Sequence, residues 1–350
     1  MFFQIILAIF HVYHVIIAMI GCSLNSLLIY LAMFRSPKAI ESYATLIINF
    51  ALTDLVECFL DYFLQIRLIP APMDVTLTFI LNGPCQYFGA KICYVSLSIF
   101  LHCIPHAVWS LLLSFGYRYY ILLHPAVKRN TIILIVCIIY LPSLFQGLTY
   151  WTNFVERDKI LPYSKKVLPT YDFDSETGVM TGIIDIKTWT AIYAISHMAF
   201  PITPVYIIIF ILRKKIIKYL EANERIMSKE TKAVHSQLLK VLTIQAMTPA
   251  FMWIGVTLYF IAQLGIYNHP LMEYLMFGSV ILMPTVSPFV YLYFVRPYKT
   301  FCTRLLQKIG LLRKSRVTDN SKKINFDSGT GFATNISTLP PIRGTTRTAE

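Results

Sequence analysis

The sequence is dominated by long stretches that contain no charged residue. Six of them have at least 22 residues each, and they cover 1–34, 92–117, 130–155, 188–212, 241–272 and 274–295. The hydrocarbon core of a bilayer is about 30 Å thick and is crossed by about 20 helical residues. Each stretch is therefore long enough to form a transmembrane helix.

A seventh stretch, 42–66, is rich in Leu, Ile and Phe but carries Asp54, Glu57 and Asp61. Its length favours a true span, whereas a re-entrant or surface helix would leave only six spans. We expect seven, at about 8–34, 42–66, 90–122, 131–151, 188–212, 238–262 and 272–295. The fold class is then an all-α bundle of seven transmembrane helices, with a short tail preceding the first.

Composition and charge agree with a membrane protein. The chain is 56% hydrophobic and 14% charged, against roughly 25% charged in ordinary soluble domains. If the N-terminus is outside, 24 of the 31 Lys and Arg residues fall in inner segments, as the positive-inside bias requires. This bias accounts for the net charge of +13 without a nucleic-acid partner, and it predicts a cytoplasmic C-terminus.

The chain divides into two parts by composition. Residues 1–315 hold the apolar stretches and form the expected membrane domain, whereas 316–350 are rich in Ser, Thr, Lys, Asn and Gly. Such a composition is typical of disorder, so we expect a disordered cytoplasmic tail.

The three acids of the second span are spaced i, i+3 and i+7, which places them on one face of a helix. One interpretation is a buried polar face that binds an ion, a proton or a cationic ligand group. In the other, Glu57 and Asp61 lie near the outer end of the span and reach water, and Asp54 alone is buried.

No pattern in the sequence favours catalysis or metal binding. His102 and His106 are four residues apart, but no Cys, Asp or Glu nearby completes a metal site and Pro105 interrupts the helix between them. The phosphate-binding, dinucleotide-binding, zinc-protease and serine-hydrolase motifs are all missing from the sequence. We expect neither an enzyme, nor a cofactor, nor a bound metal.

Five local motifs resemble rhodopsin-like G-protein-coupled receptors and occur in the order of that family. They are Asn25 of the first span, 49–55 (N-F-A-L-T-D-L, with Asp54), 117–125 (Y-R-Y-Y-I-L-L-H-P, with Arg118 and Tyr119), 287–291 (S-P-F-V-Y, with Pro288 and Tyr291) and 296–302. The resemblance implies a buried polar site at Asn25 and Asp54. It also implies a short amphipathic helix after the seventh span.

Departures from the family pattern lie at the activation motifs. Tyr117 replaces the acid that usually precedes Arg118, Ser287 replaces the Asn before Pro288, and the sixth-span motif keeps Pro249 but has lost its Trp. Residues 82–85, 93–94, 114–120 and 284–298 resemble the nematode serpentine chemoreceptors, most closely class delta. The similarity extends over about 21–302.

The resemblance leads to two expectations about the cysteines. Rhodopsin-like receptors keep a disulfide cysteine at the outer end of the third helix, here Cys93, but its usual partner is missing because 152–187 contains no cysteine. Cys85 is the other outer cysteine, so we expect a Cys85–Cys93 bond across a folded turn, with two free thiols as the alternative. Cys302, at the inner membrane surface, is a candidate for palmitoylation.

The resemblance implies a chemosensory receptor in the plasma membrane, in sensory cilia of chemosensory neurons, with a small apolar ligand and a heterotrimeric G protein as partners. The switch residues would be Arg118, Tyr119, Pro249, Pro288 and Tyr291. The ligand pocket would be lined by Phe100, Leu101, Ile104, Ala250, Phe251 and Phe277. The alternative function is a ligand-gated channel or transporter that uses the acidic face of the second span.

Overall fold

The computed structural model describes residues 2–36, 41–72, 74–223, 229–248, 250–308 and 310. Pro249 and the tail 316–350 lie outside these ranges. Within them, seven helical stretches are long and apolar enough to cross a membrane.

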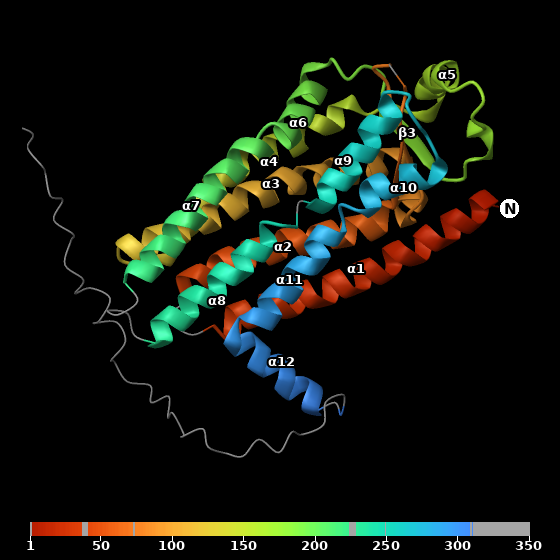
Figure 1. The fold of residues 1–350 in the computed structure, drawn as a ribbon. Helices are drawn as coiled ribbons and strands as arrows, with labels where there is room; N and C mark the ends of the chain where they lie inside the picture. Colours follow the sequence, from red (N-terminus) through yellow and green to blue (C-terminus); the bar gives the residue numbers. More distant parts are fainter. Residues whose placement is uncertain are drawn as a thin grey trace, which may run out of the picture.

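The bundle consists of helices that run alongside one another for most of their length (Figure 1). The first four spans are single helices: α1 (Phe2–Phe34), α2 (Glu41–Leu64), α3 (Ala90–Leu123) and α4 (Arg129–Tyr150). Helix α1 already begins at Phe2, where a short tail was expected. A further helix, α12 (Arg296–Lys308), follows the seventh span and leaves the bundle at an angle.

The last three spans are each interrupted. The fifth consists of α6 (Trp189–Ala199) and α7 (Ile202–Ala222), the sixth of α8 (Lys229–Gln245) and α9 (Ala250–Gln263), and the seventh of α10 (Pro270–Gly278) and α11 (Leu282–Phe294). Pro201 occupies the first break, where its missing amide hydrogen prevents a continuous helix. Pro284 lies in the first turn of α11, a position at which proline is tolerated.

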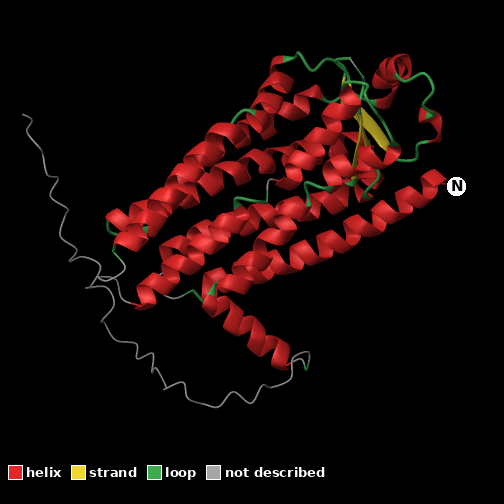
Figure 2. Ribbon diagram, in the orientation of Figure 1, coloured by secondary structure: helices red, strands yellow, loops and turns green. Residues whose placement is uncertain are grey.

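A small antiparallel sheet covers one end of the bundle (Figure 2). Its strands β1 (Ile66–Ile69), β2 (Leu77–Leu81) and β3 (Val179–Ile183) are arranged in the order β1-β2-β3. The expected all-α bundle is confirmed, and the sheet is an addition that the sequence analysis did not predict. Strands of four or five residues carry almost no periodic signal, and β3 pairs with a strand about 100 residues earlier in the chain.

We call the end of the bundle that carries the sheet the sheet end, and the end from which α12 departs the tail end. Helix α5 (Arg157–Val167) packs on β3 at the sheet end. In the described part of the chain, three short 3-10 helices lie in the connections, at Pro84–Phe88, Trp151–Asn153 and Phe173–Ser175.

The helices bury one face and expose large apolar side chains on the other. Leu134 and Leu141 of α4 and Phe210 of α7 are each more than half exposed. In a soluble protein such a surface would associate, whereas in a bilayer it faces hydrocarbon at no cost. The buried side of the bundle contains one large apolar cluster at the sheet end and another at the tail end.

Candidate functional site

The expected ligand pocket falls within the apolar cluster at the sheet end. Phe100, Leu101 and Ile104 of α3 are all buried there. The rings of Phe100 and Phe277 are 6.1 Å apart between centroids, and the ring of Phe79 of β2 lies 6.3 Å from that of Phe277. The sheet therefore covers the cluster, and its strand β2 contributes an aromatic ring that the sequence did not indicate.

The sixth span enters this cluster through different residues from those expected. Ala250 is exposed and Phe251 is half-buried, whereas Met252 is buried in the cluster. Ala250 instead lines an open cavity of about 260 Å³ with Tyr206, Ala246, Met247 and Trp253. Ala250 thus lies outside the buried cluster, and its role in a ligand pocket stays a prediction.

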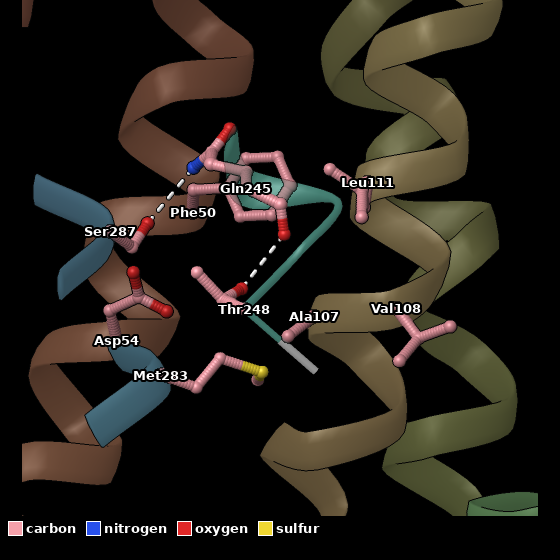
Figure 3. A pocket seen from close by; sticks show the side chains of 9 residues that line it. All are labelled: Phe50, Asp54, Ala107, Val108, Leu111, Gln245, Thr248, Met283 and Ser287. Atoms are coloured by element: carbon pink, nitrogen blue, oxygen red, sulfur yellow. Dashed lines mark hydrogen bonds between the residues drawn. The ribbon is translucent and has the colours of Figure 1, made fainter. Parts of the chain in front are cut away.

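Asp54 lies at a small cavity in the middle of the bundle (Figure 3). The cavity measures about 20 Å³, roughly the room that one water molecule needs. Gln245 spans it and donates a hydrogen bond from Nε2 to Ser287 Oγ at 2.9 Å. Thr248 Oγ1 donates to the carbonyl of Gln245 at 2.8 Å, so the end of α8 is tied to α11 beside Asp54.

Asn25, the other residue of the expected polar site, joins two helices. Its Nδ2 donates to the carbonyl oxygens of Gly21 at 2.9 Å and Pro284 at 3.1 Å. Pro284 follows the break between α10 and α11. Asn25 thus stabilises α1 against the start of α11 and does not line the cavity at Asp54.

All three acids of the second span are buried. Asp54 is 3% exposed, Glu57 1% and Asp61 0%. His14 of α1 is 1% exposed and places Nδ1 2.7 Å from Asp61 Oδ2. The interpretation in which Glu57 and Asp61 reach water is wrong, because α1 packs against α2 and places His14 on Asp61.

Arg118 lies in the interior at the tail end. It is 2% exposed, and its guanidinium carbon is 6.0 Å from the centroid of the Tyr43 ring. Tyr43 and Tyr291 are both buried in the same apolar cluster with Tyr117. Four of the expected switch residues therefore surround or belong to one region, since Tyr119 follows Arg118 and Pro288 lies one turn before Tyr291.

Tyr119 and Cys302 are less deeply buried than Arg118 and Tyr291. Tyr119 is half-buried, with Lys215 Nζ 5.7 Å from its ring centroid. Pro249 lies outside the described residues. Cys302 is half-buried on α12, against the cluster that contains Tyr291.

The two histidines of the third span serve as hydrogen-bonding groups. His102 Nε2 lies 2.8 Å from Tyr140 Oη, and His106 Nε2 lies 3.2 Å from Asn49 Oδ1. Among the residues that the structure describes, no three His, Cys, Asp or Glu side chains are grouped as a metal site.

Sequence reasoning missed an ionic cluster at the sheet end, centred on Arg67 of β1. The guanidinium donates from Nε and Nη2 to Glu273 Oε2 at 2.9 and 2.6 Å, and from Nη1 to Glu176 Oε1 at 2.8 Å. Tyr171 also receives a hydrogen bond from Nη2 and donates one to Glu176 Oε1 at 2.5 Å. The cluster joins β1, the segment before β3 and α10.

The charges in this cluster depend on one another. Burial acts to lower the pKa of Arg67, but Glu273, Tyr171, Tyr274 and Glu176 together outweigh it and keep that pKa above its ordinary value. A signal for the cluster existed in the sequence: Glu273 is the only charged residue in 241–295, and Arg67 is one of only two basic residues in 39–117.

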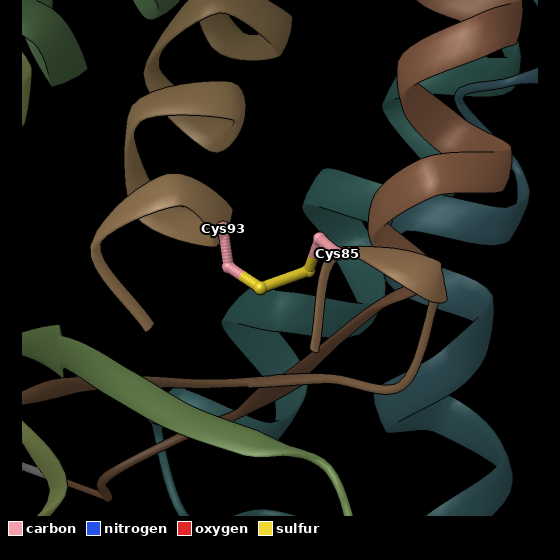
Figure 4. The surroundings of a disulfide bond; sticks show 2 residues. All are labelled: Cys85 and Cys93. Carbon is pink, nitrogen blue, oxygen red and sulfur yellow. A yellow bond between two sulfur atoms is a disulfide. The ribbon is translucent and has the colours of Figure 1, made fainter. Parts of the chain in front are cut away.

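Cys85 and Cys93 are joined by a disulfide (Figure 4), with the two Cα atoms 5.1 Å apart. The bond is sterically possible because α3 begins only at Ala90 and the chain turns at Gly89, whose φ is 94°. A side chain rarely tolerates that backbone conformation. The bond fixes the 3-10 helix Pro84–Phe88 to the first turn of α3.

This architecture is that of a rhodopsin-like membrane bundle. Squid rhodopsin superposes with a TM-score of 0.63 over 86% of this chain and 82% of its own, at 13% sequence identity. That likeness establishes the seven-helix fold.

Sequence comparison then identifies the family. The model of the serpentine type 7TM GPCR chemoreceptor Srd matches residues 10–304. Serpentine receptor class delta-19 of Caenorhabditis elegans is 53% identical over 315 residues, which cover 89% of this chain and 93% of the relative. Class delta-18 from the same organism is 51% identical over 331 residues, covering 94% and 98%. The chain therefore belongs to the nematode class delta serpentine chemoreceptors, a family of receptors and not of enzymes.

Proposed function

We propose that this receptor binds a small apolar ligand at the sheet end and activates a heterotrimeric G protein at the tail end. The sheet end would face the outside and the tail end the cytoplasm. This orientation is supported by the 24 of 31 Lys and Arg residues that it assigns to inner segments. The receptor would act in the plasma membrane of sensory cilia.

The break in the sixth span is the observation that carries the proposal. Helix α8 contributes Leu238 and Val241 to the cluster around Tyr43 and Tyr291 at the tail end. Helix α9 contributes Met252 to the cluster around Phe100 at the sheet end. The break between Gln245 and Ala250 thus lies between the two clusters, where a ligand that shifts α9 can change the angle of α8.

The covered apolar cluster supports the class of ligand. Pockets for small molecules are lined by apolar and aromatic side chains with few polar groups. Phe79, Phe100 and Phe277 form such a surface directly beneath the sheet. A volatile or lipid-like compound suits it better than a charged one.

The experiment is nucleotide exchange on a purified G protein, driven by receptor membranes and a panel of volatile alcohols, ketones and fatty acids. Arg118→Ala should abolish the ligand-dependent exchange while surface expression persists. Arg129→Ala, which changes an exposed arginine at the same end, is the matched control and should retain exchange. Undiminished exchange in Arg118→Ala would reject the role of Arg118.

A channel or transporter is the second candidate, and the buried acids of α2 are the observation that favours it. Ligand-evoked current through receptor reconstituted without G protein would support this function. Its absence, together with exchange in the first assay, would support the receptor.

Cys302 remains a candidate for palmitoylation. Its place on α12 beside the membrane surface supports the assignment. Hydroxylamine-sensitive labelling with a palmitate analogue, lost in Cys302→Ser, tests it.

A further inference from the structure

One face of α2 carries three acidic residues, Asp54, Glu57 and Asp61, in the interior of the bundle. We call these three residues the acidic row. Consecutive members are separated by about 4.5 and about 6 Å of helical rise. Glu57 lies between the other two, close enough for both to act electrostatically on it. None of the three residues is more than 3% exposed.

A histidine from the neighbouring helix is directed into the acidic row. His14 of α1 is 1% exposed and contacts Asp61 through Nδ1 at 2.7 Å. Its other ring nitrogen, Nε2, has no hydrogen-bond partner in the described part of the chain, and neither have Glu57 Oε1 and Asp61 Oδ1. Buried polar atoms are normally paired. The three unpartnered atoms therefore indicate that the acidic row binds something besides its own side chains.

The other titratable groups that face the row are thiols and phenols. They are Tyr13 and Cys22 of α1, Cys58 of α2, Cys103 of α3 and Tyr291 of α11. None of these groups is a cation. The histidines of α3 are directed elsewhere, His106 to Asn49 and His102 to Tyr140 of α4.

Three ionised carboxyls on this face would be strongly unfavourable. Each charge loses its hydration on burial, and neighbouring carboxylates repel until one of them takes up a proton. We propose that the acidic row is a proton-binding site, in which Glu57 holds an exchangeable proton between the His14–Asp61 pair and Asp54. A bound proton needs no cavity around it. The small cavity described above is lined by Asp54 and does not include Glu57.

Beyond Asp61, polar side chains continue toward the surface at the sheet end. His11 of α1 is exposed and lies with Nδ1 2.9 Å from Gln65 Oε1. The backbone amide of Gln65 donates to the backbone carbonyl of Asp61 at 2.7 Å. The Asp61 end of the acidic row therefore lies close to an exposed histidine.

Proton binding should also influence how α1 packs on α2. The two helices are in close contact beside Glu57, because a Cβ built on Gly21 would lie 2.3 Å from Cys58 Sγ. An ionised Glu57 would need water or a donor, and neither can enter without separating the helices. The bound proton therefore favours the closed packing, which ties the state of the bundle to pH.

Infrared spectroscopy of the full chain in phosphatidylcholine nanodiscs tests the proposal, because a protonated carboxyl has a carbonyl stretch separate from the carboxylate bands. At neutral pH, we expect this band in wild type, shifted when glutamate is ¹³C-labelled. The band should be lost in Glu57→Gln and retained in Asp174→Asn, a surface control whose side chain is 69% exposed.

Either of two results would overturn the proposal: no such band in wild type at neutral pH, or a band that persists in folded Glu57→Gln. If Glu57→Gln does not fold, the infrared spectra of isotope-labelled wild type and of Asp61→Asn test the proposal instead. A band that shifts with labelled aspartate instead of glutamate, or that has an unchanged frequency in Asp61→Asn, would also overturn it.

Thermal unfolding provides a second measurement. Glutamate in an unfolded chain releases its proton above about pH 4.3, so the folded receptor would bind more protons than the unfolded one and its stability would fall as pH rises. The midpoint of wild type should therefore fall from about pH 6 to about pH 9, and more steeply than that of Glu57→Gln. Identical slopes in the two proteins would contradict the assignment.

Discussion

Two fully buried arginines lie at opposite ends of this receptor, and their surroundings differ. Arg67 at the sheet end is 0% exposed and is held by Glu176 and Glu273. Arg118 at the tail end is 2% exposed, and its guanidinium lies 6.0 Å from the ring of Tyr43 inside an apolar and aromatic cluster. The contacts described for Arg67 are with opposite charges, and the contact described for Arg118 is with an aromatic ring.

The difference suggests which end can rearrange. The contacts of Arg67 join three segments that are far apart in the sequence, and removing a partner from a buried ion pair typically costs about 3–5 kcal/mol. A cation over an aromatic ring contributes about 0.5–2 kcal/mol. We therefore expect the ion pairs of Arg67 to hold the sheet end more firmly than the contact between Arg118 and Tyr43 holds the tail end.

The largest effect is expected from Arg67→Ala. The variant leaves Glu176 and Glu273 buried without their cation, so it should lower stability by roughly 3–5 kcal/mol, measured by thermal unfolding in nanodiscs. Lys165→Ala is the control, because the Lys165–Asp174 pair is exposed on both sides, and it should unfold like wild type. Equal midpoints for the two variants would break the comparison between a more firmly and a less firmly held end.

The next effect concerns the disulfide at the sheet end. Cys93→Ser should lower stability by about 2–3 kcal/mol, because the bond restricts the unfolded chain over a short loop. Cys137→Ser, which changes an exposed cysteine of α4, is the matched control. Mass spectrometry of non-reduced peptides should show Cys85 and Cys93 linked in the control. Two free thiols at Cys85 and Cys93 would show that no disulfide stabilises the sheet end.

The smallest effect is expected at the tail end, from Tyr43→Leu. Loss of the ring beside Arg118 should lower stability by about 0.5–2 kcal/mol, since leucine keeps much of the apolar contact. Tyr293→Leu is the control: it removes a ring 4.4 Å from Lys299 Nζ on a side chain that is about half exposed. A loss from Tyr43→Leu as large as that from Arg67→Ala would show that both ends are equally rigid.

The seven spans could be predicted because the signal for each is local. Arg118 could be named as a candidate switch residue for the same reason. About 20 consecutive apolar residues indicate a helix wherever they occur, and the Y-R-Y motif at 117–119 can be recognised without its surroundings. The face of α9 could not be predicted in the same way. Whether Ala250 or Met252 enters the buried cluster depends on where α9 begins after the break that follows Gln245.

The ionic contacts were out of reach for another reason. Arg67 and Glu273 are 206 residues apart, and His14 and Asp61 are 47 apart. Each residue was visible in the sequence as an isolated polar group in an apolar stretch. Which of them meet depends on how β1 lies against α10 and how α1 lies against α2.

The sequence alone determined that this chain crosses a membrane and which segments do so, because the free energy of moving a helix into lipid is nearly a sum over its own residues. Tertiary structure alone decided which polar groups share the interior. The energy of a buried charge depends on what lies within a few ångströms of it, and those neighbours come from distant parts of the chain. Glu57 and Asp61 show this most clearly, since the helices packed around α2, with α1 foremost, remove them from water.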